Sequence, residues 1–223
     1  MDWRTTLEGE TTRKTPAYVL PRSIAPFLGT VMPTFALAAA AHAETFKVLH
    51  NFGVSAGDGN LPSGPLLKDS AGNLYGMTSV GGAHNLGTIY RLSPTSTGGF
   101  KETILYSFKG GLTSGAVPQG PLLRDSAGNL YGVTNAGGIN ATVRTFPTPG
   151  CGVVIKLTPT STGLWTESVL DRFTGTDGGN SFSGLVRDSK SNFYGATSVG
   201  GSKGLGTVYR LSHLHRLEGD RLT

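Results

Sequence analysis

The sequence predicts an all-β fold, namely a partial β-propeller of three four-stranded antiparallel blades. Its 34 glycines in 223 residues, with only 15% charged residues, disfavour helices, because each glycine inside a helix costs about 1 kcal/mol. Short runs rich in β-branched and aromatic residues alternate with Gly, Asn, Asp and Ser clusters, which indicates strands joined by turns. This pattern occurs three times, and four strands per copy are typical of propeller blades.

Each copy contains four runs in the same order. Tyr75 and Tyr131 stand at equivalent positions, 56 residues apart. We assign the blades to about 44–100, 101–165 and 166–212. The first runs are Val48–Phe52, Ile104–Phe108 and Val169–Phe173; the second Gly64–Asp69, Gly120–Asp125 and Gly184–Asp188; the third Asn73–Thr78, Asn129–Thr134 and Asn192–Thr197; and the fourth Gly87–Leu92, Gly152–Leu157 and Gly206–Leu211.

A hairpin turn is predicted between the second and third runs. It reads Asp-Ser-Ala-Gly-Asn at Asp69–Asn73 and again at Asp125–Asn129. An Asp side chain accepts hydrogen bonds from nearby backbone N–H groups, and Gly adopts a positive φ without steric cost. The third copy has Ser191 where the others have Gly. We therefore interpret Asp69, Asp125 and Asp188 as turn residues and not as paired catalytic acids.

The repeated aromatic positions predict packing between blades. Two sets recur, and the alternative for both is a ring of aromatic side chains that stack on a ligand. The single cysteine, Cys151, excludes an intrachain disulfide and is expected to be buried and unreactive. The two aromatic sets are Tyr75, Tyr131 and Tyr194, and Tyr90 and Tyr209.

Residues 1–43 are predicted to be a signal peptide. Basic residues precede an apolar stretch over 24–41, and Ala41-His42-Ala43 forms a small-x-small cleavage site before Glu44. Pro26 and Pro33 interrupt the stretch, which disfavours a stable membrane span. We expect an exported protein, periplasmic, cell-surface or extracellular, that does not span the membrane after cleavage. The alternative is an uncleaved anchor.

The repeat resembles the GloVer tandem repeat of Gloeobacter and Verrucomicrobia proteins. The resemblance lies in Asn73–Gly82 followed by Gly87–Pro94. The pattern recurs from Asn192–Gly201 and from Asn129–Gly138, and in this last copy Val153 stands where the pattern has a Thr. It implies an exported repeat protein with one of several surface anchors and without an established activity. The Asp-x-x-Gly-Asn-Leu-Tyr-Gly stretch is also similar to other propeller families, which supports the fold and not a function.

The pattern breaks after Leu211-Ser212. Residues 213–223 form an aberrant tail, which a truncated or frame-shifted gene would explain. Propellers typically have four to eight blades, and three would leave apolar faces and strand edges open. We therefore expect self-association or further, missing blades.

Several kinds of chemistry are disfavoured. The net charge of +5 is dispersed without a basic stripe, so no nucleic-acid partner is expected. Gly53–Gly57 matches Gly-x-Ser-x-Gly, but the following Asp58–Pro62 cannot begin the helix that a nucleophile elbow needs. His213 and His215 have no helical ligand spacing. Asp58-Gly59-Asn60 and Asp177–Asn180 are interpreted as turns and not as calcium loops. We predict no catalytic residue, metal ligand or cofactor.

An insertion at 139–150 is the one segment that is not periodic. Insertions in repeat folds gather on one face, often the binding face, although a drifted loop is the alternative. We predict an exported, non-catalytic binding or structural module whose partner is a glycan or a surface protein. The alternative is an extracellular hydrolase or lyase on a propeller scaffold. A ligand is expected at a rim of loops containing Thr78, Thr134, Arg144, Phe146 and Thr197.

Overall fold

The computed structural model describes residues 45–138 and 150–212. Contacts divide the chain into residues 1–45 and 46–223, and the fold below belongs to the second unit. The predicted signal peptide (1–43), Arg144, Phe146 and the tail 213–223 lie outside the described residues. Among the described residues no helix is long and apolar enough to cross a membrane.

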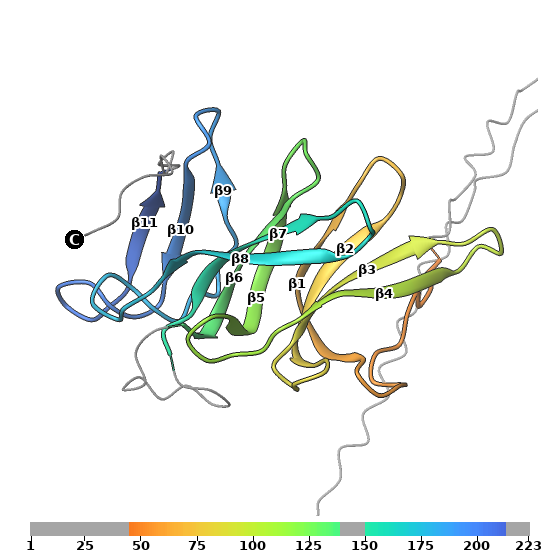
Figure 1. The fold of residues 1–223 in the computed structure, drawn as a ribbon, viewed down its shortest axis with the longest axis horizontal. Coiled ribbons are helices and arrows are strands. Elements are labelled where there is room, and N and C mark those ends of the chain that lie inside the picture. Colours follow the sequence, from red (N-terminus) through yellow and green to blue (C-terminus); the bar gives the residue numbers. More distant parts are fainter. Residues whose placement is uncertain (1–44, 139–149, 213–223) are drawn as a thin grey trace, which may run out of the picture. The chain divides into compact units, whose positions relative to one another are not determined.

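All regular structure in the described residues is β-sheet, arranged as three antiparallel sheets of four, four and three strands (Figure 1). None closes into a barrel, so the predicted all-β, partial-propeller architecture is confirmed. The sheet orders are β1-β2-β3-β4, β5-β6-β7-β8 and β11-β10-β9. The strands are β1 (Gly59–Lys68), β2 (Leu74–Gly81), β3 (Thr88–Pro94), β4 (Phe100–Ser107), β5 (Gly115–Arg124), β6 (Leu130–Gly137), β7 (Val153–Pro159), β8 (Trp165–Arg172), β9 (Val186–Arg187), β10 (Phe193–Thr197) and β11 (Thr207–Leu211).

The third sheet differs from the predicted four strands, since it has three within the described residues. In the first two sheets the fourth strand follows the third after a turn of five residues, as Thr95–Gly99 separates β3 from β4. The residues at the equivalent place after β11 lie outside the described residues.

The first run of each sequence copy does not begin a sheet. Ile104–Ser107 lies in β4 and Val169–Arg172 in β8, and these strands pair with β3 and β7 of the preceding copy. The tight turn at Thr95, whose N–H donates to the carbonyl of Gly99 at 2.9 Å, enforces this pairing. Val48–Phe52 is not a strand. A sheet thus takes its fourth strand from the next copy in the sequence.

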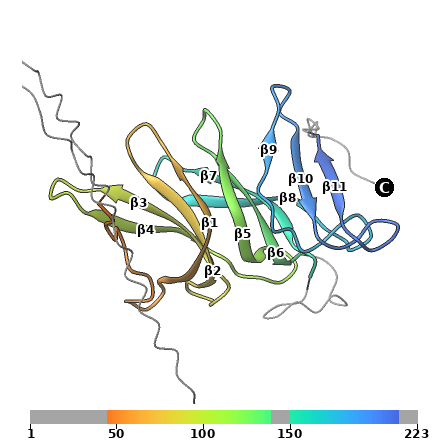
Figure 2. The same cartoon turned by 180° about the vertical axis from the view of Figure 1, so that it is seen from behind.

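The three sheets lie side by side (Figure 2), and an apolar core fills the space between each successive pair. Tyr75 and Tyr131 are 4% and 5% exposed, and the ring of Tyr131 lies 4.7 Å from that of Phe193 in β10. Packing of these two tyrosines between sheets is therefore confirmed, and so is the burial of Cys151. The first core contains Tyr75, Met77, Ile89, Leu105, Phe108, Leu122, Leu130, Val153, Ile155 and Leu157, and the second Tyr131, Val133, Cys151, Val154, Phe173, Leu185 and Phe193.

The second aromatic set accounts for the glycine that follows the motif tyrosine in the first and third copies. Gly76 pairs with Tyr90 across β2 and β3, and a Cβ at Gly76 would lie 2.4 Å from the hydroxyl of Tyr90. Gly195 and Tyr209 repeat this arrangement in the third sheet. The tyrosine ring covers the glycine, so a larger residue at the glycine would displace the ring.

The predicted hairpin turn is present in all three sheets. One oxygen of Asp69 accepts from the N–H groups of Ala71 and Asn73, and the other from the side chains of Asn73 and Tyr75, at 2.9–3.0 Å. Asp125 and Asp188 bind their own turns in the same way. The hydrogen bond from the Asn192 side chain, together with the other bonds of the turn, lowers the pKa of Asp188 to about 2. These aspartates are turn residues, as predicted.

Ser191 offers a stability test of this turn. It has a φ of +67°, in the region where Gly72 and Gly128 stand in the other copies, and a non-glycine residue there costs about 1–2 kcal/mol. We expect Ser191→Gly to raise the free energy of unfolding by about 0.5–1 kcal/mol, after the larger chain entropy of glycine is subtracted. Urea unfolding measures this. The reciprocal Gly128→Ser should destabilise by a similar amount, and a less stable Ser191→Gly variant would contradict the prediction.

Candidate functional site

Three equivalent positions in successive repeats bring polar side chains together. The first lies two residues before the phenylalanine of the first run, the second directly before an equivalent glycine (Gly59, Gly115 or Gly178), and the third on the fourth strand, opposite Leu92 or Leu157. In the first repeat they are His50, Asp58 and Glu102, and in the second Tyr106, Ser114 and Glu167. The third repeat has Asp171 and Asp177 at the first two positions, and its third position lies beyond the described residues.

The cluster of the second repeat forms a closed set of hydrogen bonds. The hydroxyl of Tyr106 donates to Glu167 Oε2 at 2.5 Å, and that of Ser114 donates to Glu167 Oε1 at 3.1 Å. The two hydroxyl oxygens are 3.3 Å apart. Burial, followed by the bond to Glu167, raises the pKa of Tyr106 to about 12. Burial also raises the pKa of Glu167. Both carboxylate oxygens of Glu167 are thus paired with neutral donors.

An open pocket lies over this second cluster. Its volume is about 330 Å³, within the range of small-molecule sites. Lys109, Thr113 and Thr166 are exposed at the pocket, whereas Trp165 packs partly against the first core. The lining residues are Tyr106, Lys109, Thr113, Ser114, Trp165, Thr166 and Glu167.

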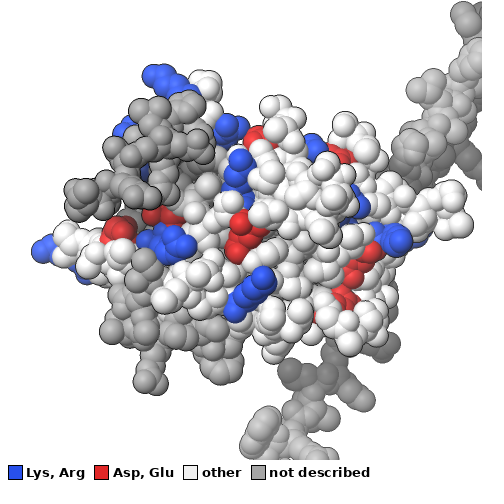
Figure 3. All heavy atoms as spheres, in the orientation of Figure 1, with Lys and Arg blue, Asp and Glu red and all other residues white. Residues whose placement is uncertain are grey.

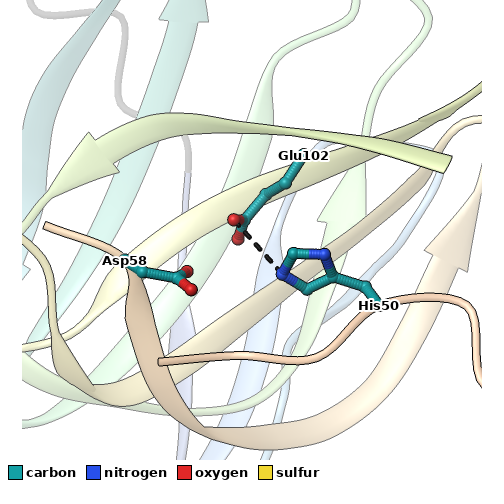
Figure 4. A group of neighbouring side chains, drawn as sticks. All are labelled: His50, Asp58 and Glu102. Atoms are coloured by element: carbon teal, nitrogen blue, oxygen red, sulfur yellow. Dashed lines mark ion pairs between the residues drawn. The ribbon is translucent and has the colours of Figure 1, made fainter. Parts of the chain in front are cut away.

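The cluster of the first repeat has a different composition. The ligand atoms of His50, Asp58 and Glu102 all lie within 4.8 Å of one another, and His50 Nε2 is 3.3 Å from Glu102 Oε2. Figure 4 shows the three side chains converging, with the Asp58 carboxylate directed toward the other two. Asp58 accepts hydrogen bonds from the backbone N–H groups of Gly53, Val54 and Gly59 at 2.7–3.2 Å, which fixes its position.

The two carboxyl groups of the first cluster have different electrostatic environments. Burial, and then the neighbouring Asp58, raises the pKa of Glu102 to about 7. Burial also acts to raise the pKa of Asp58, but hydrogen bonds from Glu102 and from three backbone amides outweigh it, and that pKa is lowered. Within the described part of the chain, Glu102 Oε1 and His50 Nε2 are buried without a hydrogen-bond partner.

The structure places the three threonines of the expected rim within strands. Thr78, Thr134 and Thr197 lie in β2, β6 and β10 and are 0%, 0% and 8% exposed. Each hydroxyl donates to the carbonyl two residues later, at 2.9–3.0 Å, and accepts a backbone N–H from the next strand at 3.0–3.2 Å. Buried backbone groups require such partners. These side chains therefore support the sheets. Arg144 and Phe146 lie outside the described residues.

Sequence reasoning missed the clusters because their members come from three separate runs. The sequence alone indicated only a turn at Asp58. A comparison of equivalent positions in the three copies could have found them. The first position is His, Tyr or Asp and the second is Asp, Ser or Asp, while the surrounding apolar pattern stays constant.

Charges are mixed on the face drawn in Figure 3, where basic and acidic side chains alternate without a stripe of one sign.

The described fold is that of a tandem-repeat protein built from stacked β-sheets with the same turn, glycine and threonine positions in each. A family model described as the Gloeobacter/Verrucomicrobia repeat matches residues 29–146, more than half of the chain. The chain belongs to this repeat family. No curated protein and no solved structure was found to match it.

Proposed function

We propose that the chain is an exported, non-catalytic repeat module that binds a glycan in the pocket of the second repeat. The observation that carries this proposal is the pocket of about 330 Å³ that combines Trp165, Lys109 and Glu167. Export is supported by the basic, apolar and small-x-small sequence of residues 1–43. A bound glycan on the cell surface or in the periplasm is a partner that such a protein would meet.

The pocket offers the groups that a sugar requires. A sugar ring presents hydroxyl groups, which both donate and accept, and an apolar face of C–H groups. Lys109 supplies up to three donors, and the Glu167 carboxyl group keeps lone pairs beyond the two that Tyr106 and Ser114 use. Thr113 and Thr166 add exposed hydroxyls, and Trp165 adds an aromatic surface.

A non-catalytic role is favoured by the number of carboxyl groups at this pocket. Enzymes that cleave glycosidic bonds generally use two, whereas Glu167 alone lines this pocket among the described residues. The recurring aspartates are engaged in their own turns. The hydrolase alternative is favoured by Asp58 and Glu102, whose pKa values are shifted in opposite directions. Both side chains are largely buried, however, which opposes access by a polymer.

A glycan array with the purified full chain tests the proposal. We expect binding to at least one glycan, weakened about tenfold or more by Lys109→Ala, because losing a hydrogen bond to a charged group costs about 1.5–3 kcal/mol. Lys101→Ala is the matched control, since Lys101 is an exposed lysine on β4 outside this pocket. Binding that neither variant changes would contradict this pocket. Hydrolysis of an array glycan, abolished by Glu102→Gln, would support the hydrolase alternative.

A further inference from the structure

We propose that His50, Asp58 and Glu102 form a binding site for a divalent cation of the Zn²⁺ class. This site is separate from the pocket of the second repeat and does not depend on glycan binding. It revises the expectation, drawn from the sequence, that the chain has no metal ligand. Three observations support it: the spacing of the ligand atoms, the unpaired buried atoms, and the comparison with the neighbouring repeat.

The spacing of the ligand atoms fits a small cation. Zn²⁺ binds imidazole nitrogen and carboxylate oxygen at about 2.0–2.2 Å, so two ligands in a tetrahedral site are roughly 3.4 Å apart. His50 Nε2 and Glu102 Oε2 are 3.3 Å apart, and the third ligand atom lies within 4.8 Å of both. The Asp58 carboxylate faces this pair (Figure 4).

Two buried polar atoms of this cluster make no hydrogen bond among the described groups. Glu102 Oε1 has no such partner, and His50 Nε2 has its ion-pair contact with Glu102 Oε2 at 3.3 Å and no hydrogen bond. Buried polar atoms are rarely left so. When both carboxylates are ionised, they repel each other at this distance. A divalent cation would pair with both of them and with the imidazole nitrogen at the same time. Three backbone amides already hold Asp58 in place, which reduces the ordering that binding would require.

The neighbouring repeat shows how the same place is stabilised without a cation. There Tyr106 and Ser114 donate hydroxyl protons to the two oxygens of Glu167. The first repeat keeps the glutamate but replaces these donors with an imidazole and a second carboxylate. The change replaces two hydroxyl donors with two groups that can bind a metal ion. Structural support of the sheets requires no such change.

The donor set indicates which cation the cluster prefers. Imidazole nitrogen suits zinc, nickel or copper, whereas calcium and magnesium prefer oxygen ligands alone. One nitrogen and two carboxylates match Zn²⁺ sites with three protein ligands and a fourth position open to water. The competing explanation is a proton shared by Asp58 and Glu102, which would leave the cluster without metal affinity.

Calorimetric titration of ZnCl₂ into the untagged full chain tests the site. We expect the double variant His50→Tyr/Asp58→Ser, which restores the hydroxyl donors of the second repeat, to lose one equivalent of Zn²⁺ while its circular dichroism stays unchanged. Glu102→Gln should weaken the same equivalent about 100-fold, a loss of about 2.7 kcal/mol. The matched controls are His84→Gln, an exposed histidine, and Glu167→Gln, the equivalent glutamate; both should keep full binding.

A reciprocal exchange tests the proposal in the other direction. Tyr106→His/Ser114→Asp places the first cluster's groups in the second repeat and should add one equivalent of Zn²⁺. Co²⁺ should give the visible absorption of a four-coordinate site with the wild type and lose it with His50→Tyr/Asp58→Ser. Unchanged stoichiometry and affinity in that double variant, or no Zn²⁺ binding by the wild type, would overturn the proposal and favour the shared proton.

Discussion

Replacing Phe108 with alanine is expected to lower the free energy of unfolding by about 3–5 kcal/mol. Phe108 is 0% exposed, lies in the core between the first two sheets, and packs edge-on against Tyr106 with ring centroids 5.3 Å apart. The cavity left by the ring would remove contacts that join the two sheets. Chemical denaturation monitored by tryptophan fluorescence, compared with the wild type, measures the loss.

Phe52 is the control for this variant because it stands at the equivalent position of the first repeat. It is only partly buried and contacts Tyr90, with ring centroids 4.9 Å apart. Phe52→Ala should therefore cost less than half as much as Phe108→Ala. Equal losses would contradict the view that Phe108 stabilises the contact between sheets.

Gly152→Ala is the second substitution with a large expected effect, about 3 kcal/mol or more. Gly152 has a φ of +92°, and a Cβ there would lie 2.0 Å from the carbonyl oxygen of Thr134. The strain of a positive φ costs about 1–2 kcal/mol, and forcing β6 and β7 apart at this point adds about 1–3 kcal/mol. Thermal unfolding followed by circular dichroism measures the loss.

Gly163 separates the two contributions to that loss. Its φ is +81°, but a Cβ there would meet nothing within 4 Å. Gly163→Ala should thus cost only the backbone strain, about 1–2 kcal/mol. If the two alanine variants were equally stable, the close approach of Gly152 to Thr134 would not matter to folding.

Local rules predicted the strands and turns of this protein well. The turn at Asp69 depends on groups within six residues, and the structure has the expected hydrogen bonds to Asn73 and Tyr75. The sheet in which residues 104–108 pair is not determined by their own local sequence. Periodicity identifies this run as a strand, but the short turn at Thr95–Gly99 decides that it pairs with β3.

The candidate site was harder to predict for the same reason. His50, Asp58 and Glu102 come from three runs, and only the pairing of β3 with β4 fixes Glu102 near the other two. A hydroxyl in a repeated motif suggests surface chemistry, whereas Thr78 is 0% exposed and bonds within its sheet. Burial of a polar side chain is decided by packing, which the local sequence does not reveal.

The offset between sequence copy and sheet has a consequence for how such genes can change length. Because β4 and β8 belong to the copy after their sheet, no internal sheet is encoded by one copy alone. Unequal crossing-over that gains or loses a whole copy would leave every internal sheet with its fourth strand, since any copy can supply one. Each added copy then shares a sheet with the copy before it. Cleavage of the chain between two copies would leave the neighbouring units held together by strand pairing.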